Sequence, residues 1–416
     1  MNKQQLASKI WQSANKMRSK IEANDYKDYI LGFVFYKFLS EKEEKFLKDN
    51  DFSDEDIKQN LNEENTEVVE FVQNSLGYFI SYDHLFSTWL GKGKDFDVSD
   101  VRDALSAFDR LISSSHTKVY QKIFDTLRTG LSKLGDSSNT QTKAVSDLIH
   151  LIKSIPMSGR QDYDVLGFIY EYLISMFAAN AGKKAGEFYT PQAVSKILAK
   201  IVTSGKTKLK SVYDPTCGSG SLLLRVAKEV EDVSNFYGQE LNRTTYNLAR
   251  MNMIMHDVHY RKFDIKQEDT LEHPQHLEHR FEAIVANPPF SANWSANPLH
   301  LNDDRFSQYG KLAPSSKADF AFIQHMIYHL DDNGTMAIVL PHGVLFRGGE
   351  EGAIRRQLIE QNHIDAIIGL PANIFFGTGI PTVILVLRQK RTNTDVLIVD
   401  ASRHFTKVGK NNKLQA

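Results

Sequence analysis

The feature that most constrains the fold is an alternation of short apolar runs with amphipathic segments over residues 209–400. Eight runs are typical of strands: residues 209–214, 235–240, 261–267, 281–287, 334–341, 363–371, 382–388 and 395–400. Segments with helical spacing separate several of them: residues 243–257, 318–330 and 350–362. Apolar strands joined through helices are typical of parallel sheets covered on both faces. We therefore predict an α/β fold with a mainly parallel, doubly wound sheet.

The N-terminal third has a different pattern, because its apolar residues recur at three- and four-residue spacing, as in "YILGFVFYKFLSEKEEKFL" and "VRDALSAFDRLI". This spacing predicts a helical domain. Residues 133–147 are small and polar, so we predict a connection between domains or between long helices there. We place the domain boundary near residue 155, which gives a helical domain over residues 1–155 and an α/β domain over residues 156–416.

The composition limits where the protein acts and how it binds its substrate. A single cysteine, Cys217, excludes an intrachain disulfide and favours a reducing, cytoplasmic compartment. The chain has neither a signal-peptide pattern nor an apolar run long enough to predict a membrane span. The 50 Lys and Arg residues against 51 Asp and Glu residues give a formal net charge of −1, unlike the basic excess of proteins that hold DNA alone. If the chain acts on nucleic acid, we expect a partner to supply much of the binding.

The first strand runs into "DPTCGSG", residues 214–220, and ligands of such sheets bind at the carboxyl ends of the strands. Gly218 and Gly220 allow a tight turn and a close approach of the backbone to a ligand. A dinucleotide-binding loop is disfavoured, because Leu223 stands where the third glycine of that fingerprint would be. Asp214 suits a cationic amino-acid group better than a pyrophosphate, which it would repel.

Carboxylates also follow the next two predicted strands. Glu240 can accept both hydroxyls of a ribose, as the acidic residue of nucleotide-binding folds does. Asp269 can accept from an adenine amino group. Solvated surface positions are the alternative for both residues. Together with the loop over residues 214–220, they indicate a nucleoside-containing ligand with an amino-acid part.

The fourth strand ends in "NPPF", residues 287–290, where a buried strand more often meets a Gly- or Asp-rich turn. Methyl transfer to a base amine needs acceptors for the amine hydrogens, because the nitrogen lone pair is otherwise delocalised into the ring. The Asn287 side chain and the backbone carbonyls supply acceptors, and Pro288 and Pro289 lack competing N–H groups. Phe290 can stack on the base and stabilise its developing positive charge. The alternative is a Pro-Pro strand terminator without a ligand.

His273, His276 and His279 recur at spacing three, which raises the possibility of a metal site. No cysteine or paired carboxylate accompanies them on a predicted rigid element. We interpret the segment as a solvated loop and expect no metal. Cys217 has no histidine nearby in sequence, so we interpret it as a small packing residue.

The ordered motifs "GEFYTPQAV", "DPTCGSGSLL", "FYGQEL" and "NPPF" resemble those of the amino-methylating DNA adenine methyltransferases, most closely the modification subunit of type I restriction-modification systems. The segment over residues 11–40 is similar to the helical N-terminal domain of that subunit, so the resemblance covers nearly the whole chain. It implies a Rossmann-like S-adenosylmethionine-dependent methyltransferase domain after a helical domain. Members of the family usually continue with a further helical region, whereas this chain stops at Ala416, as a truncated form or a short relative would.

The resemblance also implies roles for individual residues. Thr190 would cap a helix whose first position is Pro191. Phe375 or Phe376 would supply a second aromatic face to a flipped-out adenine, beside Phe290. The cofactor-binding residues would be Glu187, Phe188, Tyr189, Thr190, Pro191 and Gln192 at the methionine end, Asp214, Thr216, Gly218, Ser219, Gly220 and Ser221 at the amino-acid part, Glu240 at the ribose, and Asp269 at the adenine.

The partners implied are DNA, a separate specificity subunit that reads the sequence, and a restriction subunit, with two copies of this chain per specificity subunit. Two other functions remain open. One is an amino-methyltransferase acting on RNA or on a protein glutamine, since the same loop suits any planar amide or amine. The other is a non-catalytic scaffold that binds only cofactor and partner, against which the intact Asn287, Pro288 and Phe290 argue.

Overall fold

The computed structural model describes residues 2–17, 23–155, 157, 168–169, 172, 190–375, 378–409 and 411–415. The chain forms two compact units: unit 1 is Met1–Phe177 with Arg250–Tyr260, and unit 2 is Ala178–Ala249 with Arg261–Ala416. The predicted boundary near residue 155 adjoins residues outside the described part of the chain, so it stays a prediction. In the described part of the chain, every helix is too short or too polar to cross a membrane.

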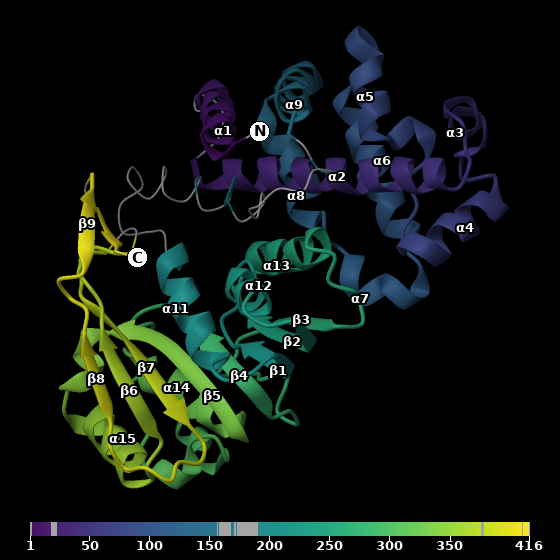
Figure 1. Cartoon of the computed structure of the whole chain (residues 1–416). Helices are drawn as coiled ribbons and strands as arrows, with labels where there is room; N and C mark the ends of the chain where they lie inside the picture. The colour runs from purple at the N-terminus through teal and green to yellow at the C-terminus, as the bar shows by residue number, and fades with distance from the viewer. Residues whose placement is uncertain are drawn as a thin grey trace. The chain divides into compact units, whose positions relative to one another are not determined.

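Unit 1 is helical, as its periodicity predicts (Figure 1). Within its core the Tyr36 and Trp89 rings stack with centroids 4.7 Å apart. The buried Glu43 carboxylate accepts the Ile80 N–H at 2.9 Å, so helix α2 is fixed to the segment that follows α4. Among the described residues, the α-helices that lie wholly in it are α1 (Lys3–Met17), α2 (Ala23–Asp49), α3 (Asp54–Asn60), α4 (Thr66–Leu76), α5 (Phe86–Lys92), α6 (Val98–Arg110), α7 (Thr117–Tyr120), α8 (Asp125–Gly130) and α9 (Ser138–Ile152).

The prediction of a connection over residues 133–147 was wrong, because α9 begins at Ser138. Ser137 caps the helix: its hydroxyl accepts the Thr140 N–H at 3.3 Å, and the Thr140 hydroxyl accepts the Ser137 N–H at 3.1 Å. This reciprocal cap stabilises a polar first turn. Val145 and Leu148 lie one turn apart and are buried, so the apolar half of the helix anchors it in the core.

Unit 2 contains an eight-stranded sheet with the order β3-β2-β1-β4-β5-β7-β6-β8. The pairs are parallel except that β7 runs antiparallel to β5 and β6. The strands are β1 (Lys208–Asp214), β2 (Asp232–Glu240), β3 (Phe263–Gln267), β4 (Phe281–Ala286), β5 (Leu330–Pro341), β6 (Ile364–Gly369), β7 (Thr382–Arg388) and β8 (Leu397–Asp400). The prediction of a mainly parallel α/β sheet is therefore confirmed.

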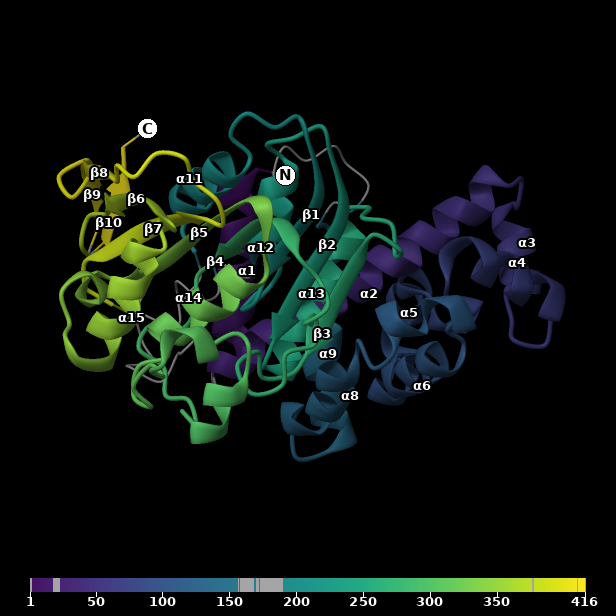
Figure 2. The ribbon, with the colours of Figure 1, turned by 90° about the horizontal axis from the view of Figure 1, so that it is seen from below.

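Helices cover both faces of this sheet (Figures 1 and 2). Helices α11 (Gln192–Val202) and α12 (Ser221–Ala227) lie on one side, and α14 (Asp319–Tyr328) and α15 (Gly349–Glu360) lie on the other. Helix α13 (Arg243–Met255) contributes residues to both units. Because both faces are covered, the central strand β4 is buried along most of its length, which explains the apolar run from Ala283 to Ala286.

Strand order and direction decide which loops meet. Strands β1 and β4 are neighbours, and β1 leads to β2 on its other side, so the order reverses between β1 and β4. The antiparallel β7 pairs Thr382 with Pro341 at the end of β5, which brings the segment before β7 to the carboxyl edge of the parallel strands. A second sheet, the hairpin of β9 (Phe405–Val408) and β10 (Asn411–Leu414), was not predicted.

Candidate functional site

The loop after β1 turns through two left-handed glycines, Gly218 at φ +53° and Gly220 at φ +76°. A Cβ at Gly218 would meet none of the described residues within 4 Å, so the backbone there borders open space in that part of the structure. Helix α12 then begins at Ser221, whose hydroxyl lies 2.8 Å from that of Ser219. The loop therefore presents backbone and small hydroxyl groups without bulk.

Asp214 ends β1 and is 1% exposed. Its Oδ1 accepts the Thr216 N–H at 2.9 Å, while Oδ2 has no hydrogen-bond partner among the described residues. Burial, together with the nearby Glu240 charge, raises the pKa of Asp214 to about 8, against the opposing hydrogen bond from Thr216. A buried carboxyl with one unused oxygen fits a ligand that brings a cationic N–H group.

Glu240 ends β2 and fixes the glycine loop. Its Oε2 accepts the Gly218 N–H at 3.0 Å, and its Oε1 accepts the Asn242 N–H at 2.8 Å. Asp269, after β3, accepts the N–H groups of Leu271 and Glu272 at 2.9 and 3.1 Å through Oδ1. Each carboxylate oxygen has further lone pairs, so both side chains can still accept from a ligand.

Thr190 and Asn287, 97 positions apart in the sequence, meet through their side chains. Asn287 Nδ2 donates to Thr190 Oγ1 at 3.0 Å, and both residues are buried. The prediction that Thr190 caps a helix was wrong: α11 begins at Gln192, Pro191 occupies the cap position, and the Thr190 hydroxyl is engaged by Asn287. Because the amide nitrogen donates to Thr190, the Asn287 oxygen is oriented as an acceptor.

The residues after Asn287 leave the buried strand and reach the surface. Pro288 is buried, Pro289 is exposed, and Phe290 is half-buried. The Phe290 ring meets the buried Phe375 ring edge to face, with centroids 5.4 Å apart and an interplanar angle of 78°. The buried Phe375 ring therefore packs against Phe290 and fixes the orientation of the Phe290 ring.

Three charged residues that no sequence motif indicated hold this loop. The buried Asp319 carboxylate at the start of α14 accepts the Ser291 N–H at 2.8 Å and the Ser291 hydroxyl at 3.2 Å. Arg347 pairs with Asp319 at 2.9 Å and with Glu351 at 3.1 Å. Ser291 adopts a φ of +49°, so Asp319 stabilises an uncommon backbone conformation directly after Phe290. The "AD" at residues 318–319 carried no pattern that would have shown this contact.

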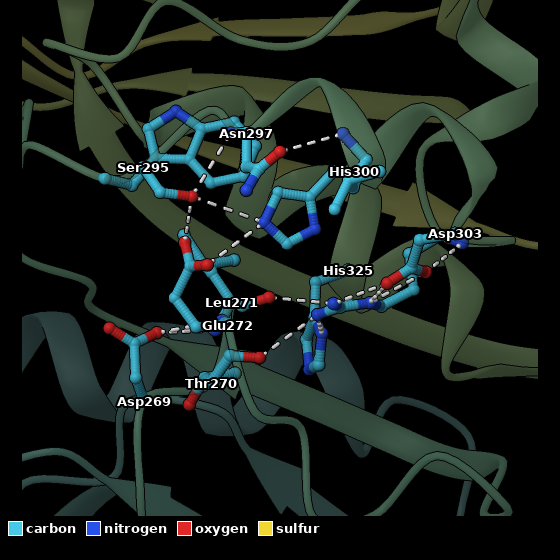
Figure 3. A network of polar contacts seen from close by, with 12 residues as sticks. Asp269, Thr270, Leu271, Glu272, Ser295, Asn297, His300, Asp303 and His325 are labelled. Carbon is cyan, nitrogen blue, oxygen red and sulfur yellow. Dashed lines mark hydrogen bonds and ion pairs between the residues drawn. The ribbon is translucent and has the colours of Figure 1, made fainter.

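A second missed group joins the segment after "NPPF" to the loop after β3, as Figure 3 shows. The Arg305 side chain is 1% exposed and pairs with Asp303 at 2.7 Å. Its guanidinium also donates to the Thr270 and Leu271 carbonyls at 3.1 and 2.8 Å. Thr270 in turn donates its hydroxyl to the Pro215 carbonyl at 2.5 Å. Arg305 thus connects residues 303–305 with the loop after β1 through one intermediate residue.

The same two segments meet again nearer the surface. Glu272 accepts the Ser295 hydroxyl at 2.6 Å, and His300 Nε2 lies 3.1 Å from its other oxygen (Figure 3). Ser295 and His300 hold the pKa of Glu272 below its usual value, although burial opposes them. The Trp294 indole stacks on His300 with centroids 5.3 Å apart. The segment over residues 294–305 therefore contacts residues 270–272 twice, through Glu272 and through Arg305.

Buried histidines lie beneath this group. His325 Nδ1 is 3.1 Å from Arg305 Nη1, which can only donate, so the neutral imidazole carries its proton on Nε2 and donates to Tyr213 Oη at 3.0 Å. Burial, together with nearby His329 and Arg305, lowers the pKa of His325 well below its usual value. The interpretation of residues 273–279 as a solvated loop was wrong for His276, which is buried with Nε2 3.2 Å from the Gly238 carbonyl oxygen.

The structure gathers most of the predicted site residues at the carboxyl edge of β1 to β4. Within the described residues, His, Cys, Asp and Glu side chains form no group of three suited to a metal ion. Cys217 is buried in the loop after β1, and burial raises the pKa of its thiol. Four predicted site residues lie outside the described part of the chain: Glu187, Phe188, Tyr189 and Phe376.

Two family models match the chain. Residues 161–416 match N-6 DNA Methylase, and residues 6–152 match the HsdM N-terminal domain. The methylase subunit of the type I restriction enzyme MpnII from Mycoplasma pneumoniae is 38% identical over 98% of this chain and 80% of that protein. The MjaIX methylase subunit from Methanocaldococcus jannaschii is 26% identical over 97% of this chain and 73% of that protein.

A solved structure also matches over the whole chain. It is the methyltransferase subunit of a type I restriction-modification system from Streptococcus thermophilus, with 41% identity and a TM-score of 0.89. The match covers 100% of this chain and 90% of that one. A modification subunit of a type I restriction enzyme from Vibrio vulnificus, at 19% identity and a TM-score of 0.61, shares the fold.

Proposed function

Because the chain belongs to the methylase subunits of type I restriction enzymes and to the N-6 DNA methylase family, we propose that it transfers a methyl group from S-adenosylmethionine to the N6 atom of an adenine that has left the duplex. The observation that carries this proposal is the Asn287–Thr190 hydrogen bond beside the Phe290–Phe375 ring pair. It fixes an amide acceptor and an aromatic face at the end of β4, next to the loop after β1.

The acceptor half of the reaction depends on this arrangement. An adenine N6 lone pair becomes a better nucleophile when its hydrogens are held by oxygens that favour a tetrahedral nitrogen. Asn287 would offer its side-chain oxygen, and the loop would offer a backbone carbonyl. Pro288 and Pro289 have no N–H groups that would compete with the amine as donors. Phe290 would stack on the base. Catalysis then rests on positioning and electrostatics, without a strong general base.

The residues of the donor half fit S-adenosylmethionine, which would supply a sulfonium-bound methyl group. Among the described residues, Asp214 Oδ2 has no hydrogen-bond partner and could accept from the ammonium group, and Gly218 borders open space. Glu240 would accept the ribose hydroxyls, and Asp269 would accept from the adenine. The remaining residues that we propose at this cofactor are Glu187, Phe188, Tyr189, Thr190, Pro191, Gln192, Thr216, Ser219, Gly220 and Ser221.

Cofactor affinity should depend on pH through Asp214. With a pKa of about 8 in the ligand-free protein, the carboxyl is mostly protonated at pH 6 and ionises more as the pH rises. A bound ammonium group favours the ionised form, so binding near neutral pH releases a proton and tightens by up to about tenfold per pH unit. Titration calorimetry from pH 6 to 7.5, where an α-amino group stays largely charged, measures this slope.

The matched variant is Asp214→Asn, which retains the shape and cannot ionise. It should bind the cofactor more weakly and with a flatter dependence on pH. A wild-type dissociation constant that stays constant over this range would show that Asp214 does not pair with the ammonium group.

We further propose that a separate specificity subunit reads the DNA sequence for two copies of this chain, that a restriction subunit joins the complex, and that the complex acts in the cytoplasm. The formal net charge of −1 supports a partner that supplies DNA affinity. The test is transfer of labelled methyl from S-adenosylmethionine to DNA by the chain alone and by the chain co-expressed with its specificity subunit. Adenine labelling that requires the partner is the expected result.

Two other outcomes would favour the alternative functions. Labelling of RNA or of a protein glutamine, with DNA unlabelled, would identify an amino-methyltransferase with another acceptor. Cofactor binding and complex assembly with no methyl transfer to any of these acceptors would identify a scaffold.

A further inference from the structure

An exposed phenylalanine lies in the turn that follows β5, at the carboxyl edge of the sheet. Phe346 is 64% exposed, while Val344, two positions earlier in the short helix η8 (His342–Leu345), is 1% exposed. A single exposed apolar residue is ordinary on a protein surface. Phe346 differs from that case in two ways. Hydrogen bonds fix its backbone, and the neighbouring residue, Arg347, is linked to the loop that carries Phe290.

Several hydrogen bonds fix the turn. The Phe346 and Arg347 N–H groups donate to the Gly343 carbonyl at 3.2 and 3.0 Å. The Arg355 guanidinium on α15 donates to the Val344 and Arg347 carbonyls at 3.0 and 2.8 Å, on both sides of Phe346. These bonds fix the backbone of the turn against α15, and the phenyl ring on it is 64% exposed.

The loop is also tied to the proposed base site. Arg347, the next residue, pairs with Asp319, whose carboxylate also holds Ser291 directly after Phe290. On the other side, the His342 N–H donates to the Pro381 carbonyl at 3.1 Å, in the segment that follows Phe375. The His342 ring meets the Phe346 ring edge to face at 5.1 Å. The residues next to Phe346 and Phe290, Arg347 and Ser291, therefore both contact Asp319.

The charged residues next to Phe346 indicate what its ring would contact. Arg347 is paired with both Asp319 and Glu351, so its charge is neutralised by carboxylates and is not directed at a phosphate. The group presented to solvent is a phenyl ring, which suits an apolar base face. Proteins that unstack DNA often insert or stack an apolar side chain at the disturbed step.

We propose that Phe346 stacks on a DNA base beside the extruded adenine and stabilises the open duplex. This inference rests on the proposed adenine methylation. Extruding a base breaks its stacking on its neighbours, and an aromatic ring already fixed at the site replaces part of that contact without ordering a flexible loop. Phe290 would stack on the extruded base, and Phe346 would stack on a base that remains in the duplex beside it.

The test compares Phe346→Ala and Phe346→Trp in the complex with the specificity subunit. The DNA carries 2-aminopurine in place of the target adenine. The matched control is Ile359→Ala, which truncates another exposed apolar side chain, 57% exposed, at the far end of α15. We expect Phe346→Ala to lose most of the fluorescence rise that reports extrusion. Its kcat/KM on the unsubstituted DNA should fall about tenfold, the size of one lost base-stacking contact. Cofactor affinity should not change, and Phe346→Trp should restore both signals.

Three results would overturn the inference. Normal extrusion and methylation by Phe346→Ala would show that the ring does not contact DNA. Loss of co-purification with the specificity subunit would assign the ring to a protein interface. A wild-type complex that binds cofactor but methylates no DNA adenine would remove the proposed function itself, and this result is separable from the other two because it appears before any variant is made.

Discussion

Replacing Asn287 with alanine is expected to slow methyl transfer to DNA about 10²–10³-fold, the usual loss when one preorganised polar contact to a reacting group is removed. The variant lacks the oxygen that would accept from the adenine amine, and it leaves the Thr190 hydroxyl without the amide that donates to it. The effect should fall mainly on kcat, because the lost oxygen would act on the adenine amine, while Asp214, Glu240 and Asp269 of the proposed cofactor site lie at or after the ends of other strands. Single-turnover methylation with labelled cofactor measures the rate, and calorimetry measures cofactor affinity.

A matched control is Asn333→Ala, which removes an exposed asparagine near the amino end of β5, at the opposite edge of the sheet from "NPPF". It should methylate at the wild-type rate. Thr190→Val should give an intermediate loss, because Asn287 would remain but its orientation would no longer be fixed by a hydrogen bond. If Asn287→Ala keeps a rate within about threefold of wild type, the amide does not act on the amine, and the residue is only a strand terminator.

Replacing Arg305 with methionine is expected to destabilise unit 2 by about 2–4 kcal/mol, because two carbonyls would lose their buried guanidinium donor. Arg305 is 1% exposed, and its loss would leave the Thr270 and Leu271 carbonyls without the guanidinium donor and Asp303 without its cationic partner. For a unit of this size the melting temperature should fall by about 10 °C. Thermal unfolding followed by circular dichroism measures the change.

The control for this prediction is Arg356→Met, which removes an exposed arginine paired with Glu360 on the surface of α15. Exposed pairs of this kind contribute less than about 1 kcal/mol, so the melting temperature should change little. Arg305→Lys should not restore stability, because an ammonium group cannot reproduce the guanidinium fork that reaches two carbonyls and a carboxylate. Equal losses in Arg305→Met and Arg356→Met would contradict a structural role for the buried group.

The strand and helix pattern of unit 2 was predictable because it depends on local periodicity. The buried part of a strand such as β4 is apolar, and glycine suits the left-handed positions of Gly218 and Gly220. Both features can be recognised in short stretches of sequence. The prediction over residues 133–147 failed for the same local reason. Small polar residues there belong to the first turns of a capped helix, and most of its buried apolar residues, such as Leu148 and Ile149, come after that stretch.

The alternation of strands and helices, the glycine loop after β1 and the amide and aromatic groups of residues 287–290 could be recognised without the structure. The distant side chains that hold them could not: Thr190 contacts Asn287, Asp319 contacts Ser291, and Arg305 contacts the loop after β3. The physical reason is that secondary structure follows from neighbours a few positions apart, whereas a buried polar group takes its partner from whichever segment packs against it. That choice depends on strand order and direction, which no short stretch of sequence contains.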